Sequence, residues 1–162
     1  MSNDAEIETR FWKALKSDRT VMIGLVGVED GIGQPMTTQT EQEGRGPIYI
    51  FSAKDTDLVR QLGQTNPSTV HFVYKGHHLF ANLSGHLTTD NDRATIERLW
   101  NPFVAAWYKG GKDDPNLQLL RFDAERLQIW LNENSIFAGI RMLLGSDPKK
   151  DYVDKTAQVT IP

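Results

Sequence analysis

The chain has 162 residues, a formal net charge of −3 and no cysteine. This length predicts a single domain that can bury a sizeable core. Hydrophobic residues make up 39% of the chain and charged residues 24%, which is the composition of a folded globular protein and not of a disordered one. A slightly acidic chain is a poor candidate for a nucleic-acid binder. The absence of cysteine excludes disulfides, thiolate catalysis and cysteine-ligated metals.

Export and membrane insertion are not expected from this sequence. The first ten residues are polar and acidic and lack the apolar segment of a secretory signal. The longest apolar run, Val21 to Val28, is too short to span a bilayer. We therefore expect a cytoplasmic protein without a membrane partner.

The first half of the chain predicts one helix followed by strands and a short second helix. Ile7, Phe11 and Leu15 recur at helical spacing, which predicts a helix over 5–17. Residues 20–28 are apolar at both alternating sets of positions, so we expect a strand buried on both faces. A hairpin at Asp30-Gly31 leads into the next strand. The further elements expected here are strands over 34–39 and 48–51 and a helix over 55–64, which Asn66-Pro67 ends.

The second half of the chain predicts more hairpins, interrupted by helices. Alternating apolar residues indicate strands over 70–74 and 79–88, and Asp90 is the expected cap of the following helix. That helix carries Ile96, Leu99 and Trp100 on its inner face. The remaining expected elements are a helical turn over 103–108, strands over 117–123 and 126–131, a helix over 135–144 and a closing strand over 157–161.

The order of these elements predicts the fold class. Short strands joined mostly by hairpins must be antiparallel neighbours, and so many of them close most easily into a barrel. We therefore predict a mainly β (α+β) fold, an antiparallel β-barrel with helices packed outside it or across its mouth. We expect the whole chain, 1–162, to form one domain, with the barrel core over about 20–131 and a C-terminal helix and tail over 132–162.

Few polar residues suggest chemistry by themselves. The four histidines, His71, His77, His78 and His86, lack the spacing of a metal site. Asp113-Asp114 precedes a proline and is better interpreted as a turn cap than as an acid–base pair. Dinucleotide-binding and phosphate-loop glycine motifs are absent from the sequence.

A cluster of aromatic residues is the most unusual feature. Trp100, Phe103, Trp107 and Tyr108 fall within nine residues. Three of them follow helical spacing and could pack in the core or at a dimer interface. The alternative is a site for a planar ligand, because aromatic rings stack on flat ligands in apolar pockets. The sequence pattern leaves both interpretations open.

Several short motifs occur in an order that resembles a known family. In chain order they are Gln34-Pro35-Met36-Thr37, Ile48 to Asp55, Asn66-Pro67, Leu83-Ser84-Gly85, Thr89-Asp90, Leu99 to Pro102 and Ala106 to Pro115. This series resembles the general stress protein 26 type of the pyridoxamine 5'-phosphate oxidase-like superfamily, the FMN-binding split barrels. The resemblance implies a six-stranded split β-barrel. It also implies a homodimer that binds FMN, or FAD, in two sites between its subunits.

The resemblance also assigns residues to the flavin site. Met36 and Thr37 correspond to the strand that contacts the flavin ring, and Phe51 and Ser52 to the neighbouring strand. Trp107, from the family's tryptophan motif, is expected to close the site from the other subunit.

Two positions depart from the family pattern. Gln34 stands where the family commonly has arginine, and Leu58 where it commonly has lysine, so two cations for the flavin phosphate are missing. The resemblance leaves Lys54, Thr56 and the backbone amides at Asp55 as candidate substitutes, because helix N-termini attract anions. A site without these cations could bind flavin poorly, or could accept FAD.

The resemblance implies a flavin-binding general stress-type protein and leaves its activity open. An oxidoreductase of unknown substrate is one alternative, in which the flavin carries out the redox chemistry. The others are a flavin-carrying or flavin-sensing dimer, an interaction module on a degenerate barrel, and a reductase that uses deazaflavin or nicotinamide. Pyridoxamine phosphate oxidase activity is not expected, because Arg141 is the single arginine after Leu131 and the family's arginine-rich substrate signature is missing.

Overall fold

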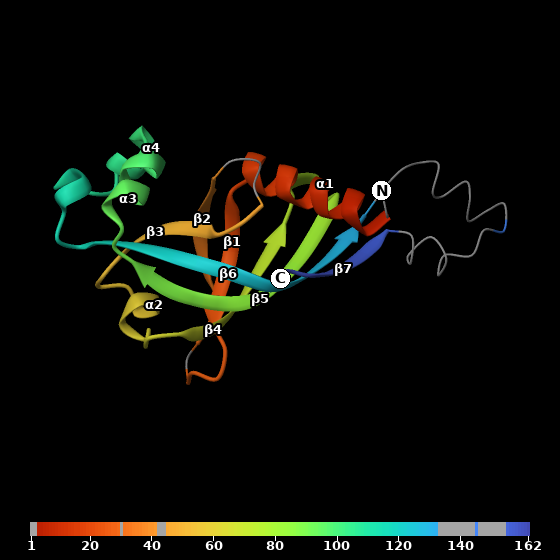
Figure 1. Cartoon of the computed structure of the whole chain (residues 1–162), viewed down its shortest axis with the longest axis horizontal. Coiled ribbons are helices and arrows are strands. Elements are labelled where there is room, and N and C mark those ends of the chain that lie inside the picture. The colour runs from red at the N-terminus through yellow and green to blue at the C-terminus, as the bar shows by residue number, and fades with distance from the viewer. Residues whose placement is uncertain (1–2, 30, 42–44, 133–144, 146–154) are drawn as a thin grey trace.

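A computed structural model of the chain describes residues 3–29, 31–41, 45–132, 145 and 155–162. Its helices are α1 (Asn3–Ser17), α2 (Asp57–Arg60), α3 (Arg93–Leu99) and α4 (Pro102–Ala105), with 3-10 turns η1 (Lys75–His77) and η2 (Gly111–Asp113). Its strands are β1 (Thr20–Leu25), β2 (Gln34–Thr40), β3 (Ile48–Ala53), β4 (Asn66–Val73), β5 (Leu79–Asp90), β6 (Leu117–Leu131) and β7 (Thr156–Thr160) (Figure 1). The expected helix over 135–144 lies outside the described residues.

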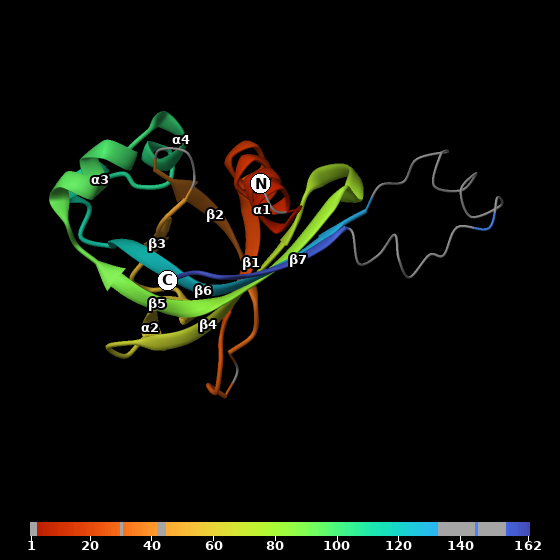
Figure 2. The ribbon, with the colours of Figure 1, turned by 45° about the vertical axis from the view of Figure 1, so that its right-hand side comes forward.

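The strands of the described chain form one antiparallel sheet that closes on itself. Its order is β3-β2-β1-β4-β5-β6-β7, and an additional pairing joins β3 to β6. All the pairings are antiparallel. Strands β1 to β6 therefore form a six-stranded barrel, and β7 extends the sheet beyond β6 (Figures 1 and 2). The prediction of an antiparallel barrel with flanking helices is confirmed.

Strand β6 corrects the expected strand pair over 117–123 and 126–131, because it is one continuous strand with a bulge. Gly85 of β5 pairs with Ala124 and Ser84 pairs with Arg126, which leaves Glu125 without a partner in β5. The bulge divides β6 into one half that pairs with β3 and another that pairs with β7. Position 85 requires glycine, since a Cβ there would lie 2.0 Å from the carbonyl oxygen of Asp123.

Strand β1 is shorter than expected, and its apolar continuation is not buried. It ends at Leu25, and Val26 and Val28 are 51% and 37% exposed. At the other end of the segment Thr20 and Met22 are also exposed, so the expectation of two-sided burial over 20–28 holds only for residues 23–25. The chain leaves the barrel after Leu25 to make the β1–β2 connection, in which the Gly31 N–H donates to the Val28 carbonyl.

Two helix boundaries also differ from the prediction, each for a local reason. The helix expected over 55–64 is reduced to α2. The Asn66 side chain bonds to both backbone groups of Gly63 and to the Leu87 carbonyl, so Asn66 begins β4. The cap of α3 is Asp92 and not Asp90, because the Asp92 carboxylate accepts the backbone N–H of Thr95.

The main core fills the barrel and continues under α1. Ile7, Phe11 and Leu15 are at most 2% exposed and belong to the same cluster as the inward side chains of the strands. The Phe11 ring meets the Phe72 ring of β4 edge-on at 6.0 Å between centroids. Helix α1 also lies against β6 and β7, so both ends of the described chain meet over one face of the barrel.

A second core lies outside the barrel, between β3, β6 and the helices α3 and α4. Ile48 and Ile50 of β3 point into the main core. The alternate residue Tyr49 points outward and packs with Leu119 of β6 and with Ile96 and Val104 of the helices. Strand β3 and the first half of β6 are therefore buried on two faces, and this places α3 and α4 firmly on one side of the barrel (Figure 2).

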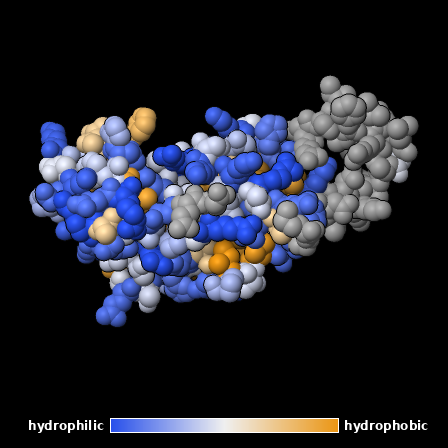
Figure 3. Space-filling model, turned by 45° about the horizontal axis from the view of Figure 1, so that its top comes forward, coloured by the Kyte–Doolittle hydropathy of each residue, from blue (hydrophilic) through white to orange (hydrophobic). Residues whose placement is uncertain are grey.

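The molecular surface is mostly hydrophilic on the face shown in Figure 3, where apolar residues appear as small separate spots. Within the described ranges, the most exposed large apolar side chains are Trp107, Phe103 and Ile32, at 83%, 82% and 74%. Among the described residues, no helix is both long enough and apolar enough to cross a membrane.

Replacing Phe11 with alanine tests whether α1 is an integral part of the main core. Phe11 is fully buried, so Phe11→Ala should lower the free energy of unfolding by about 3–5 kcal/mol. Urea denaturation followed by circular dichroism measures the change. The exposed neighbour Lys13 provides the control, because Lys13→Ala should change stability by less than about 0.5 kcal/mol. Equal stability of the two variants would show that α1 is not anchored there.

Candidate functional site

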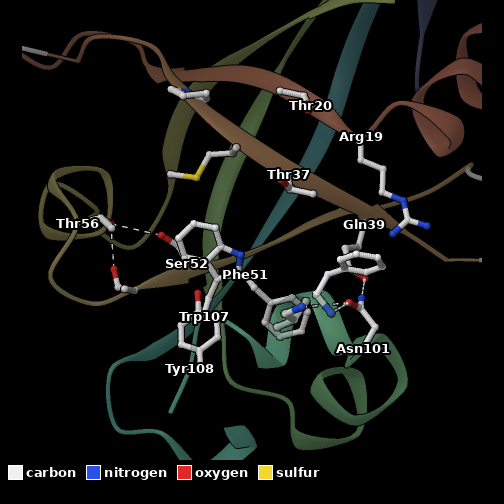
Figure 4. Close-up of a pocket in the computed structure, with 15 residues that line it drawn as sticks. Arg19, Thr20, Thr37, Gln39, Phe51, Ser52, Thr56, Asn101, Trp107 and Tyr108 are labelled. Carbon is white, nitrogen blue, oxygen red and sulfur yellow. Dashed lines mark hydrogen bonds between the residues drawn. The ribbon is translucent and has the colours of Figure 1, made fainter. Parts of the chain in front are cut away.

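A pocket of about 690 Å³ opens between the barrel strands β2 and β3 and the segment that contains α4 (Figure 4). This volume is in the range of small-molecule sites, roughly 300–1,000 Å³. The lining residues are Arg19, Thr20, Pro35, Met36, Thr37, Gln39, Phe51, Ser52, Ala53, Thr56, Asn101, Phe103, Val104, Trp107 and Tyr108. Arg19 carries the one formal charge among these described lining residues.

The aromatic cluster is divided between core packing and the pocket. Trp100 packs edge-on against Phe51, with 5.9 Å between ring centroids. It lies against the second core, to which Tyr108 belongs. Phe103 and Trp107 line the pocket and are more than four-fifths exposed. The packing interpretation therefore holds for Trp100, whereas the exposed Phe103 and Trp107 lie where a planar ligand could stack, and ligand binding there stays a prediction. The division arises because α3 ends at Leu99 and a new helix begins at Pro102, so Trp100 does not continue the face of Trp107.

Asn101 positions the aromatic wall of the pocket. Its side-chain oxygen accepts the backbone N–H groups of Phe103 and Val104, which caps α4. Pro102 at the first helical position fits this start, because its fixed φ suits a helix N-terminus. The Asn101 side-chain nitrogen donates to the Gln39 side-chain oxygen at 3.3 Å. One residue thus links the helical wall of the pocket to β2.

Tyr108 brings a buried hydroxyl to the pocket. The side chain is 9% exposed, and burial, together with the nearby negative charge of Asp114, raises its pKa to about 12. It is therefore neutral at physiological pH. The hydroxyl has no hydrogen-bond partner among the described residues, and in Figure 4 it points up toward Trp107. A buried hydroxyl without a partner costs free energy, which a ligand acceptor would recover.

Ser52 and Thr56 form a hydroxyl pair at one side of the pocket. Their side-chain oxygens are 3.4 Å apart. The Thr56 hydroxyl donates to the Ala53 carbonyl and accepts the Val59 N–H, which caps α2. This leaves Ser52 as the hydroxyl with more freedom toward a ligand. Helix α2 has four residues, so its aligned peptide dipoles add little to the attraction of an anion.

Arg19 and Gln39 lie on the opposite side of the pocket and were not predicted from the sequence (Figure 4). Arg19 precedes β1, and its carbonyl accepts both the backbone N–H and the hydroxyl of Thr38, at 2.8 and 3.1 Å. The register between β1 and β2 is what brings Arg19 beside the end of β2. Hydrophobic patterns in the sequence do not specify this strand register, so the position of Arg19 beside the end of β2 could not be inferred from them.

Six of the residues assigned by resemblance come together in this pocket. They are Met36, Thr37, Phe51, Ser52, Thr56 and Trp107. Trp107 lines the pocket of its own chain. Its expected position across a subunit boundary stays a prediction.

The other three assigned residues do not line the pocket. Leu58 is 2% exposed and packs in the main core, so a lysine could not replace it without leaving that core. Gln34 begins β2 and is paired with Ile23. Lys54 is exposed, and its backbone N–H donates to the Asn116 carbonyl.

The acidic pair at the end of η2, Asp113 and Asp114, serves the loop structure, as interpreted from the sequence. The Asp114 carboxylate accepts the backbone N–H groups of Asn116 and Gly110, which lowers its pKa. Asp113 forms an ion pair with Arg93 at 2.7 Å. Of the histidines, His86 pairs with Glu125 and His77 stacks on Phe80.

Solved structures with similar sequences share this fold. The general stress FMN/FAD binding protein from Xanthomonas citri is 58% identical, with a TM-score of 0.78 over 82% of this chain and 93% of its own. A general stress family protein from Xanthomonas campestris pv. campestris is 57% identical, with a TM-score of 0.79 over 84% and 94% of the two chains. A general stress protein 26 from Jannaschia is 28% identical, with a TM-score of 0.76 over 98% and 99%.

The family assignment agrees with these similarities. No curated protein matches the chain. The family described as "Pyridoxamine 5'-phosphate oxidase like" matches residues 6–152, which is most of the sequence. This confirms the resemblance drawn from the motif order. The chain belongs to the pyridoxamine 5'-phosphate oxidase-like family.

Proposed function

We propose that this chain is a flavin-binding protein of the general stress type that holds FMN, or FAD, in the pocket beside α4. The observation that carries the proposal is the pocket itself, which combines exposed aromatic side chains with a buried hydroxyl that has no partner in the described part of the chain. The 58% identity to a protein described as FMN/FAD binding supports it independently.

The residues present suit the flat ring of a flavin. Phe51, Met36 and Val104 offer apolar surface, and the exposed Trp107 indole is free to cover a planar ligand. The polar edge of the ring needs hydrogen-bond donors, and the neutral Tyr108 hydroxyl is one that lacks a partner in the described chain. These residues would hold the ring by stacking and by a small number of directed hydrogen bonds.

We assign the phosphate of the flavin to the hydroxyl pair of Ser52 and Thr56. The resemblance leaves Thr56 as a candidate for this role and places Ser52 on the strand beside the flavin ring. Neutral hydroxyls would then take over from the two cations that the family commonly has at the positions of Gln34 and Leu58. A hydrogen bond to a charged group contributes roughly 1.5–3 kcal/mol, and a neutral one about 1 kcal/mol. We therefore expect FMN to bind with modest affinity. Most of that affinity should come from the contacts with the flavin ring.

The pocket supports redox chemistry by the flavin without a protein acid or base. When bound, the flavin supplies hydride or electron transfer. Among the described lining residues there is no carboxylate, histidine or lysine, and Tyr108 stays protonated near neutral pH. This chain would bind and orient the flavin and the molecule that reacts with it. A pocket lining without an acid or base is also compatible with a non-enzymatic flavin carrier, which is the alternative function.

We also propose that the protein is a homodimer. Phe103 and Trp107 together expose two large aromatic side chains beside an open pocket. Exposed apolar residues of this kind commonly mark interaction surfaces. Sedimentation equilibrium should give about twice the monomer mass of 18.3 kDa. A monomer at all concentrations would contradict a site shared between subunits.

Removing the Trp107 indole should weaken flavin binding without unfolding the protein. The side chain is 83% exposed in the single chain, so Trp107→Ala should leave the fold of the subunit intact, and the circular dichroism spectrum should not change. Loss of ring stacking should weaken FMN binding by about tenfold or more. Titration of FMN fluorescence measures the affinity, and chromatography of the released flavin separates FMN from FAD.

The control for this experiment is Trp130→Phe, which changes a tryptophan of β6 that does not line the pocket. Its FMN affinity should equal that of the unchanged protein. A wild-type protein that neither carries nor takes up flavin would overturn the proposed function. Unchanged affinity in Trp107→Ala would remove Trp107 from the site.

Removing the Tyr108 hydroxyl tests the predicted hydrogen bond to the flavin. Tyr108→Phe should weaken FMN binding by about five- to tenfold, the value of one neutral hydrogen bond. Because the Tyr108 pKa is raised to about 12, the ratio of wild-type to variant affinity should be constant from pH 6 to pH 9. A ratio that changes in this range would show that the hydroxyl ionises earlier or acts through another group.

Anaerobic reduction distinguishes an enzyme from a carrier. An oxidoreductase should lose the flavin absorbance band near 450 nm when NADH or NADPH is added and regain it in air, with turnover faster than that of free FMN. A carrier should be reduced no faster than free FMN. Oxidation of pyridoxamine phosphate in air, with reduction of O2 to hydrogen peroxide, would contradict the expectation that this substrate is not used.

A further inference from the structure

We infer that the side of the pocket formed by Arg19 and Gln39 binds an anionic group, a carboxylate or a phosphate, on the molecule that reacts with the flavin. This inference rests on the proposed function for the identity of the flavin. The anion part of the inference needs the structure alone, because it follows from the hydrogen-bond donors that remain free at this side of the pocket.

Arg19 is a cation whose hydrogen-bonding capacity is almost unused. Its one side-chain hydrogen bond in the described chain is a long one, from Nε to the Lys16 carbonyl, at 3.5 Å. The terminal guanidinium nitrogens have no carboxylate partner among the described residues. The backbone at Arg19 is nevertheless fixed by two hydrogen bonds from Thr38. A guanidinium on a fixed backbone, with its fork of donors free, suits a carboxylate or phosphate.

The orientation of the Gln39 amide adds a second donor at the same side. The Asn101 oxygen is occupied by two N–H groups at the start of α4, so its nitrogen must face Gln39. That nitrogen donates to the Gln39 oxygen, and the Gln39 nitrogen is left without a partner in the described chain. Helix capping at Asn101 therefore leaves Gln39 as a donor. Two donors, one of them charged, select an acceptor that carries negative charge.

The location of these donors separates them from the hydroxyl pair proposed for the flavin phosphate. Ser52 and Thr56 lie on one side of the pocket and Arg19 and Gln39 on the other (Figure 4). An anion at Arg19 would therefore belong to a second molecule. The competing possibility is that Arg19 binds the phosphate of the flavin, and the experiment must distinguish the two.

Benzoate and its neutral analogue benzamide are suitable probes, because they have nearly the same size and differ in charge. Binding is measured by the absorbance change of the FMN-loaded protein and by tryptophan fluorescence of the flavin-free protein. We expect benzoate to bind at least about tenfold more tightly than benzamide. Arg19→Gln should abolish this preference. Arg126→Gln, which removes an exposed arginine of β6 that does not line the pocket, should leave it intact.

A second variant tests the donor role of Gln39 without disturbing α4. In Gln39→Glu a carboxylate can still accept the Asn101 bond, while the donor is replaced by a negative charge. Benzoate binding should fall by about tenfold or more and benzamide binding should stay within about twofold. This variant also keeps the inference testable if Arg19→Gln folds poorly.

Titration of each variant with FMN and with riboflavin identifies the anion that Arg19 recognises. The ratio of FMN to riboflavin affinity should be the same in Arg19→Gln and in the wild-type protein. A fall in that ratio would assign Arg19 to the flavin phosphate and overturn the inference. Equal binding of benzoate and benzamide, or no benzoate binding, would also overturn it. A failure of the proposed function is distinguishable, because it would appear as absent flavin binding while the fluorescence arm still reports on the anion.

Discussion

The pairing of β3 with the first half of β6 is the constraint on which the rest of the structure depends. It joins β3, the first strand of the sheet order, to β6, the last strand but one, and converts a sheet into a barrel. The same two strand segments are buried on both faces, with Ile50 and Phe122 in the barrel core and Tyr49 and Leu119 under the helices. One set of backbone hydrogen bonds therefore supports two hydrophobic cores. The pocket exists because the outer core holds α4 at a fixed place beside β2 and β3.

The general form of this fold could be predicted from the sequence, because it depends on local patterns. Alternation of apolar residues and turn signals identifies most strands, and hairpin connections make them antiparallel neighbours. The predicted boundaries failed where a side chain from a distant element decided the outcome. Asn66 begins β4 because it bonds to Leu87, 21 residues later. The bulge at Glu125 reflects the close approach of Gly85. Neither contact is visible in a local window.

The candidate site shows the same division between local and distant information. Motif order identified Met36, Phe51 and Trp107, since these stand in recognisable stretches of the family. It did not identify Arg19, which has no motif and reaches the pocket through the register between β1 and β2. The missing family cations were visible in the sequence. That Leu58 is part of the barrel core, so that the departure is structural as well as electrostatic, required the fold.

Asn101 gives the two sides of the pocket a common energetic element. Asn101 caps the helix that bears Phe103. Through one hydrogen bond between side-chain amides it also sets the orientation of Gln39. An anion that holds Gln39 would therefore also restrict α4, and a ring held against α4 would restrict Gln39. By thermodynamic linkage, each ligand would raise the affinity for the other by the same factor. Either ligand alone would then bind more weakly than it does when the other is also in the pocket.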